Sequence, residues 1–234
     1  NVFSHIISLY SLLRKRIRSN PLLTPDKVSK MSMTIGSWNL NRKTLEKKPD
    51  INKLLHAQHL DLLGLPEVDL PIDKSGGVPL SVQGFSVIKP LHKSVKRSRN
   101  IYRLIVLVRE ELLEKISIRL DLMSPSFPSI WIQTKDDPKI LICFYYRMWK
   151  DGNSTTSIDD QQSRLNTLLD QFHHASLVSK HLVAVGKMNI DANKLNDNAY
   201  HLKSISDMYR SFISSIGMEL MPVGVGIKHT IIHI

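Results

Sequence analysis

Short apolar runs that end in polar residues recur along this chain, and they constrain its fold more than any other feature. Runs of this kind are typical of buried strands. They lie at residues 34–41, 60–68, 85–91, 102–108, 116–122, 129–133, 140–146 and 181–190. Helical spacing of apolar residues is found between them at residues 49–59, 161–177 and 199–216. This pattern predicts an α+β fold, a four-layer α/β/β/α sandwich of two packed sheets flanked by helices.

The first 32 residues differ in character from the rest. Residues 2–13 are apolar, and a basic cluster of Arg14, Lys15, Arg16 and Arg18 follows them. We predict an amphipathic basic helix and then a linker, so that residues 1–32 are an extension and residues 33–234 one domain. A secretory signal would carry its charges on the other side of the apolar run, and no run approaches the ~20 apolar residues of a membrane span. A peripheral membrane role for this segment is the alternative.

The charge balance favours a polyanionic partner. With 32 basic and 21 acidic residues the chain carries a net charge of +11, which suits nucleic acid or an anionic membrane surface. The lone Cys143 excludes an internal disulfide framework and a cysteine-based zinc site, and it predicts a reducing, intracellular compartment. His173 and His174 are adjacent on a predicted helix and face different directions, which disfavours a shared metal.

Three of the predicted strands end in polar residues that do not belong in a strand core. These ends are SWNLN at residues 37–41, LGLPEV at 63–68 and VGKMNID at 185–191. Polar groups at the ends of buried strands commonly line a site, because the sheet holds them rigidly. The alternative is that each is a turn residue that satisfies local backbone groups. Three such ends in one chain favour a shared site.

These segments resemble the endonuclease/exonuclease/phosphatase superfamily, in the apurinic-like form carried by non-LTR retrotransposons. SWNLN followed by a helix and then DLLGLPEV is similar to the opening of the family. CFYYRMWKDG resembles the YREW strand end of retroelement endonucleases, and GKMNID resembles the family's GDMNID turn. The resemblance covers roughly residues 34–226. It implies a divalent-metal-dependent phosphodiester hydrolase that nicks DNA in the nucleus, as a monomer or as part of a larger polyprotein.

The resemblance also implies roles for individual residues. Asn39 and Glu67 match the positions that hold the metal, Mg²⁺ or Mn²⁺, and such ions prefer oxygen ligands. The metal would neutralise the phosphoryl oxygens and activate water. Tyr146 and Asn189 match positions near the scissile phosphate, where a hydrogen bond to developing charge assists the reaction.

Two departures from the family pattern predict lost activity. Lys187 replaces the aspartate of the GDMNID turn, and a charged lysine cannot accept a proton from water. Residues 230–234 resemble a worn S-x-IDHI segment with Ile232 where an aspartate is expected, and no SDH motif follows. We therefore expect a degenerate copy, truncated at the C-terminus, with little or no nuclease activity and a metal that is not necessarily bound. The alternative is a non-catalytic nucleic-acid-binding remnant of a retroelement polyprotein.

A basic loop is predicted at residues 92–103. Its cations would contact phosphates, which gives affinity without sequence information. The alternative is a solvated charged loop. The residues concerned are Lys93, Lys96, Arg97, Arg99 and Arg103.

Overall fold

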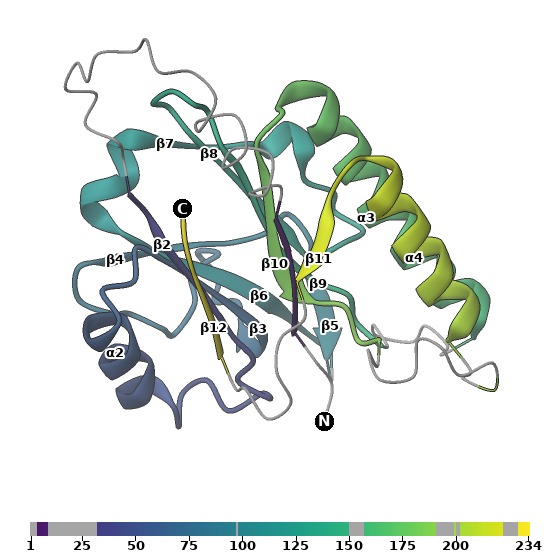
Figure 1. Ribbon diagram of the computed structural model, residues 1–234. Coiled ribbons are helices and arrows are strands. Elements are labelled where there is room, and N and C mark those ends of the chain that lie inside the picture. Colours follow the sequence, from purple (N-terminus) through teal and green to yellow (C-terminus); the bar gives the residue numbers. More distant parts are fainter. Residues whose placement is uncertain are drawn as a thin grey trace, which may run out of the picture.

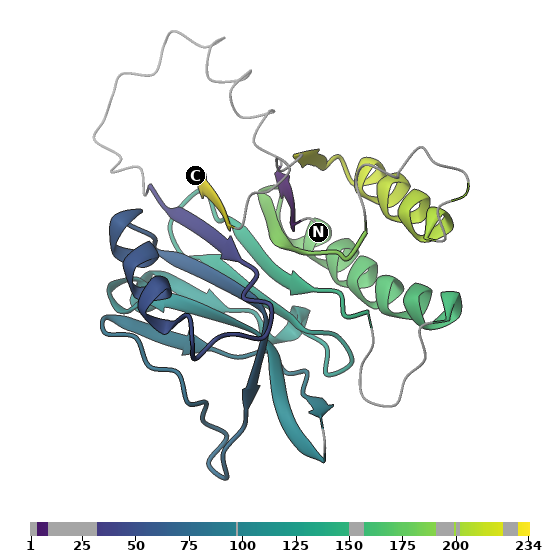
Figure 2. The ribbon, with the colours of Figure 1, turned by 90° about the horizontal axis from the view of Figure 1, so that it is seen from below.

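The computed structural model describes residues 4–8, 32–96, 98–149, 157–190, 199, 202–221 and 229–234. In these ranges the chain forms two six-stranded β-sheets packed face to face (Figure 1). Helix α2 lies on the outer side of one sheet, and helices α3 and α4 lie side by side on the outer side of the other (Figure 2). The predicted four-layer sandwich is confirmed.

The first sheet is mixed, because β9 and β10 run parallel while its other neighbours are antiparallel. Its strands, in spatial order, are β11 (Glu219–Met221), β1 (Ser4–Ser8), β10 (Leu182–Lys187), β9 (Leu141–Tyr146), β8 (Ser129–Thr134) and β7 (Ile116–Ile118). The predicted strand at residues 116–122 is therefore shorter than expected. After β7 the chain turns into a 3₁₀ helix, η2 (Leu120–Leu122), and another, η1 (Glu110–Lys115), precedes β7.

The second sheet is also mixed, with β2 and β3 parallel. Its strands, in spatial order, are β12 (His229–His233), β2 (Thr34–Trp38), β3 (Leu62–Pro71), β6 (Arg99–Arg109) and β4 (Phe85–Ile88), and β5 (Ser94–Lys96) also pairs with β6. The β5–β6 pairing corrects the prediction of a basic loop at residues 92–103, since much of that segment is a hairpin.

Among the residues that the structure describes, three α-helices cover the sheets: α2 (Lys48–Ala57), α3 (Ile158–Val178) and α4 (Lys203–Ser215). Ser157 is the N-cap of α3: its side chain accepts a hydrogen bond from the backbone N–H of Asp160 and so caps the first turn. Successive side chains of a strand point to opposite faces of the sheet, so one set packs between the two sheets and the other packs under the helices. On β9, Phe144 faces the other sheet, whereas the ring of Tyr145 packs edge-on against Phe172 of α3 with 6.0 Å between centroids.

The sheets approach closely at Gly64 of β3. A Cβ atom added at this position would lie 2.3 Å from Cδ1 of Phe144 on the facing sheet. Such a distance is far inside van der Waals contact, so only glycine fits while Phe144 keeps its place. This contact brings the strand that carries Glu67 against the strand that ends in Tyr146.

The prediction of a helix near the N-terminus is wrong for the residues of this segment that the structure describes. Residues Ser4–Ser8 form strand β1, which pairs antiparallel with β10 on one side and with β11 on the other. A short apolar run of this kind fits a helix or a strand, and tertiary pairing decides between them. The linker expected after this run lies outside the described residues.

None of the helices in the described part of the chain combines the length and apolar character required to cross a membrane. Cys143, the lone cysteine, is buried in β9, and burial raises the pKa of its thiol well above the ordinary value.

Candidate functional site at the strand ends

Four polar side chains meet where the two pairs of parallel strands end. Asn39 follows β2, Glu67 lies in the second half of β3, and Tyr146 and Lys187 are the last residues of β9 and β10. Tyr146 and Lys187 are register partners, so they end their strands side by side. The carboxyl ends of parallel strands are the usual place for a site in a sheet-based fold. The structure thus brings together residues that lie up to 148 positions apart in the sequence.

Left-handed backbone conformations gather around this site. The register between β3 and β6 shifts between Pro66 and Leu70, which marks a bulge. Within the bulge Glu67 has a φ of 59° and Asp69 a φ of 47°. Such angles are uncommon in residues other than glycine and cluster at functional sites. Five of the seven non-glycine residues with positive φ in the described ranges surround the site: Asn41, Arg42, Glu67, Asp69 and Asn189.

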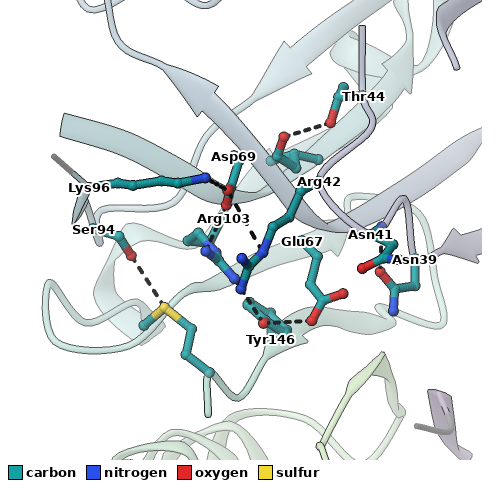
Figure 3. Close-up of polar contacts among 12 residues, drawn as sticks. Asn39, Asn41, Arg42, Thr44, Glu67, Asp69, Ser94, Lys96, Arg103 and Tyr146 are labelled. Atoms are coloured by element: carbon teal, nitrogen blue, oxygen red, sulfur yellow. Dashed lines mark hydrogen bonds and ion pairs between the residues drawn. The ribbon is translucent and has the colours of Figure 1, made fainter. Parts of the chain in front are cut away.

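Glu67 is the centre of the site. Its Oε1 accepts a hydrogen bond from the Tyr146 hydroxyl at 2.9 Å (Figure 3) and lies 2.8 Å from Nζ of Lys187. Only 13% of the Glu67 side chain and 6% of the Lys187 side chain are exposed, so this is a buried ion pair. Breaking a buried pair costs far more than breaking a surface pair, because the remaining charge loses its partner.

The surroundings of Glu67 favour its charged form. Burial by itself raises the pKa of this carboxyl. The hydrogen bond and charge of Lys187, with hydrogen bonds from Tyr146 and Asn39, outweigh burial and hold the pKa below its ordinary value. Burial also raises the pKa of Tyr146 to about 12, and the nearby charge of Glu67 adds to this effect. The tyrosine is therefore a proton donor to the carboxylate at neutral pH.

Asp69 gathers a second set of charges beside Glu67. Its Oδ1 lies 2.7 Å from Nη1 of Arg103, and its Oδ2 pairs with Lys96 and lies 3.9 Å from Nε of Arg42 (Figure 3). Arg103 also donates a hydrogen bond from Nη2 to the Tyr146 hydroxyl at 3.1 Å. Charges of opposite sign therefore alternate from Lys187 through Glu67 and Arg103 to Asp69.

Asn189 is held beside the site by a buried arginine. Arg147 is fully buried and donates hydrogen bonds from Nε to the Met188 carbonyl at 2.8 Å and from Nη2 to the Asn189 carbonyl at 3.3 Å. Its Nη1 donates to Oε1 of Gln161 on α3. The Asn189 amide in turn donates to the Arg147 carbonyl at 2.6 Å. Arg147 thereby fixes the turn after β10 to the end of β9.

The donors present do not fit a divalent metal ion. Asn39 and Glu67, the predicted ligands, lie together, but Oε1 of Glu67 is shared by the Tyr146 hydroxyl and the Lys187 ammonium. Within the described ranges no three histidine, cysteine, aspartate or glutamate side chains gather as a metal would require. A metal ion about 4 Å from the Lys187 ammonium would be repelled by it. The repulsion is about 4 kcal/mol for each unit of charge on the ion, at an effective dielectric of 20.

The predicted phosphate contacts fall into two groups. Lys93, Lys96 and Arg99 have exposed side chains on or beside the β5–β6 hairpin, while Arg97 lies outside the described residues. Arg103 is buried, with 8% of its surface exposed, and it binds Asp69 and Tyr146. Its burial makes Arg103 a positioning residue inside the protein, unlike the three exposed cations.

Sequence reasoning missed Asp69 and Arg147. Asp69 follows Glu67 by two residues, and a spacing of two along a strand places side chains on the same face. That spacing is a signal from which Asp69 could have been found. Arg147 follows the predicted Tyr146 directly, but nothing in the sequence indicates that its guanidinium turns inward to bind carbonyl groups.

Three solved structures of nucleic-acid enzymes have a similar fold. The endonuclease domain of TRAS1, a telomere-specific non-LTR retrotransposon, is 14% identical, covers 82% of this chain and 74% of its own, and has a TM-score of 0.56. The AP endonuclease LMAP from Leishmania major is 16% identical over 84% and 72% of the two chains, with a TM-score of 0.57. A 3′ phosphatase from Neisseria bound to a product DNA hairpin is 16% identical over 79% and 71%, with a TM-score of 0.55. No protein-family model and no curated protein sequence matches the chain.

Proposed function

We propose that this chain, which has the endonuclease/exonuclease/phosphatase fold that its sequence predicts, binds DNA phosphates at its strand-end site and cleaves them poorly or not at all. It would be a degenerate retroelement endonuclease domain that keeps the binding function of its relatives. The proposal concerns residues 33–234, with residues 1–32 as an extension whose strand β1 joins the first sheet.

One observation carries the loss of hydrolysis, namely the ion pair between Lys187 and Glu67. The Lys187 ammonium lies 2.8 Å from the carboxylate and is almost fully buried. Hydrolysis requires a group that orients or deprotonates the attacking water, and an ammonium ion has no lone pair with which to do so. The same ammonium opposes the approach of a metal that would generate hydroxide. One lysine thus removes both parts of the chemistry.

Binding to DNA is supported by the charges around the site. Three exposed cations lie on or beside the β5–β6 hairpin, namely Lys93, Lys96 and Arg99. They are close to the buried charges of the site, because Lys96 forms an ion pair with Asp69. The chain as a whole carries a net charge of +11. Basic side chains at a rigid site neutralise phosphates and release counter-ions, which drives binding without reading sequence. The similar Neisseria phosphatase was solved with a DNA hairpin. We place the domain in the nucleus, as a monomer or within a polyprotein.

Residual hydrolysis is the second candidate, because Asn39, Glu67 and Tyr146 still lie together at the strand ends. A nicking assay on supercoiled plasmid in Mg²⁺ and in Mn²⁺ separates the two candidates. Fluorescence anisotropy with a labelled duplex, in EDTA and in Mg²⁺, measures binding in the same buffers. We expect binding that EDTA leaves unchanged and no nicking above the buffer background. Metal-dependent turnover would favour the second candidate, and absent binding at low salt would reject both.

A further inference from the structure

Three cations converge on the single carboxylate of Asp69 (Figure 3). We propose that the two exposed ones, Arg42 and Lys96, form a phosphate subsite beside the strand-end site, with Lys43 at its rim. The ligand is a phosphate group, and in a bound DNA strand it would be the phosphate next to the one at Glu67. The inference rests on the proposed function only for the source of this phosphate.

The charges around Asp69 do not balance. Nη1 of Arg103 lies 2.7 Å from Oδ1 of the carboxylate, while Oδ2 pairs with Lys96 and lies 3.9 Å from Nε of Arg42. In the part of the chain that the structure describes, none of these cations pairs with another carboxylate. One negative charge therefore faces three positive charges, which leaves an excess of two. The adjacent ion pair at the strand ends is neutral and does not offset this excess, which favours an anionic ligand.

Arg42 and Lys43 keep their donors available for a ligand. The Arg42 side chain is 58% exposed, and its Nε is too far from Asp69 for a hydrogen bond. The Lys43 side chain is 59% exposed, and its Nζ lies 3.9 Å from Oε2 of Glu46. A guanidinium can bind two phosphate oxygens through parallel N–H groups, and an ammonium adds a mobile point charge. Both side chains can therefore turn to a phosphate without breaking a hydrogen bond to another described residue.

A cavity of about 210 Å³ opens beside these cations, between the loop after β2 and the end of β3. Arg42 and Lys43 line it, and so does Asp69, the partner of Lys96. Since one water needs roughly 10–15 Å³, the cavity has room for a phosphate group with several of its waters. Leu45 contributes apolar surface to the same wall, which suits the carbon atoms of an esterified phosphate.

The loop that carries Arg42 is fixed to the strand that carries Asp69. Arg42 has a left-handed backbone with a φ of 64°, and its N–H donates a hydrogen bond to the Glu67 carbonyl at 2.8 Å. The Thr44 hydroxyl donates to the Val68 carbonyl at 2.7 Å. These bonds hold the loop against the bulge of β3, so the cations are presented at a fixed place beside the strand-end site. A site organised before binding loses less conformational freedom when the phosphate arrives.

Titration with inorganic phosphate in the absence of DNA tests the inference. Chloride keeps the ionic strength constant, and the backbone amide and arginine Nε–Hε resonances of the ¹⁵N-labelled chain report binding. We expect saturable shifts at Arg42 in the wild type. Arg42→Ala and Lys96→Ala should each weaken the phosphate affinity by about tenfold, the effect of one charge-assisted hydrogen bond. Arg210→Ala removes an exposed arginine of α4 and should leave the affinity unchanged.

Two further measurements cover the other outcomes. Arg42→Asn replaces Arg42→Ala if the alanine variant does not fold, because asparagine tolerates left-handed backbone. A wild type that shows no saturable binding, or folded variants at positions 42 and 96 that bind phosphate as well as the wild type, would overturn the inference. Anisotropy with a labelled duplex then identifies the source of the phosphate. Competition between phosphate and duplex supports DNA, whereas phosphate binding without DNA binding at low salt would reject the proposed function and leave a subsite for free phosphate.

Discussion

Arg103 and Tyr146 come from different sheets, and Nη2 of the arginine donates a hydrogen bond to the tyrosine hydroxyl at 3.1 Å. The guanidinium also lies over the phenol ring, 5.5 Å from its centroid. The same hydroxyl donates to Glu67, so one oxygen atom joins the Asp69–Arg103 pair to the Lys187–Glu67 pair. The site is thus a continuous network that crosses the gap between the sheets.

Tyr146→Phe tests that junction. The substitution keeps the ring beneath Arg103 and removes only the hydroxyl that links Arg103 to Glu67. We expect a loss of about 1–3 kcal/mol in the free energy of unfolding, because two buried charged groups each lose a hydrogen bond. Urea denaturation measures this loss. Tyr102→Phe, on the same strand as Arg103 but with a hydroxyl that the network does not use, is the control. Equal losses in the two variants would show that the junction contributes nothing specific.

Lys187→Met tests the buried ion pair through its pH dependence. At neutral pH we expect a loss of roughly 3 kcal/mol in the free energy of unfolding, since Glu67 would remain charged, buried and unpaired. In the wild type the pKa of Glu67 is below its ordinary value, so its stabilising contribution is complete above that value and is lost as the pH falls through the folded pKa. In the variant, burial would instead raise that pKa, and acid would restore stability.

The difference between wild type and Lys187→Met should therefore shrink from neutral pH to about pH 4 and below. Urea titrations at a series of pH values measure it. A penalty that stayed constant over this range would mean that lost packing of the lysine stem, rather than its charge, causes the destabilisation.

Arg147→Lys tests the buried anchor behind Asn189. Lysine carries a similar charge but cannot bind Gln161 and two carbonyl groups at once, because it lacks the planar fork of arginine. We expect a loss of about 3 kcal/mol or more in the free energy of unfolding, as for other broken buried networks. Arg210→Lys, at an exposed position of α4, should change stability by less than about 0.5 kcal/mol. A tolerated Arg147→Lys would show that the turn after β10 needs no such anchor.

Neutralising the exposed cations of the hairpin should change how DNA binding depends on salt. Each of Lys93→Ala and Arg99→Ala should reduce the slope of log Kobs against log salt concentration by about one. Anisotropy titrations from low to physiological salt measure the slope, with Lys139→Ala as a control at another exposed lysine. Unchanged slopes in both variants would place the DNA contact on another surface.

Much of the fold could be predicted because several of its strands contain a continuous apolar run. Residues 140–146, for example, read as a buried strand from composition alone, and β9 spans Leu141–Tyr146. Strand β1 could not be assigned in this way, because its five residues become a strand by pairing between β10 and β11. Local pattern cannot distinguish that outcome from a helix.

The candidate site was predictable in part for a similar reason. Asn39 follows an apolar strand and Tyr146 and Lys187 end theirs, and strand ends can be located from the sequence. Glu67 instead lies at the bulge inside β3, after an apolar run. What each side chain binds depends on the facing sheet. The ion pair of Lys187 with Glu67 and the inward turn of Arg103 both join residues from strands that are distant in the sequence. The spacing of residues in the sequence does not predict such contacts.

Glu67, Asp69 and Asn189 have left-handed backbone, so the main chain itself sets the positions of these side chains. Main-chain conformation, fixed by strand pairing and the bulge, determines where the side chains are presented. Under the proposed function, the identity of residue 187 decides whether they can cleave a phosphodiester. If the chain is a degenerate nuclease as proposed, the replacement at position 187 would remove part of the chemistry and leave the fold and the surface of the site unchanged. Loss of activity under the proposed function would therefore not require loss of structure.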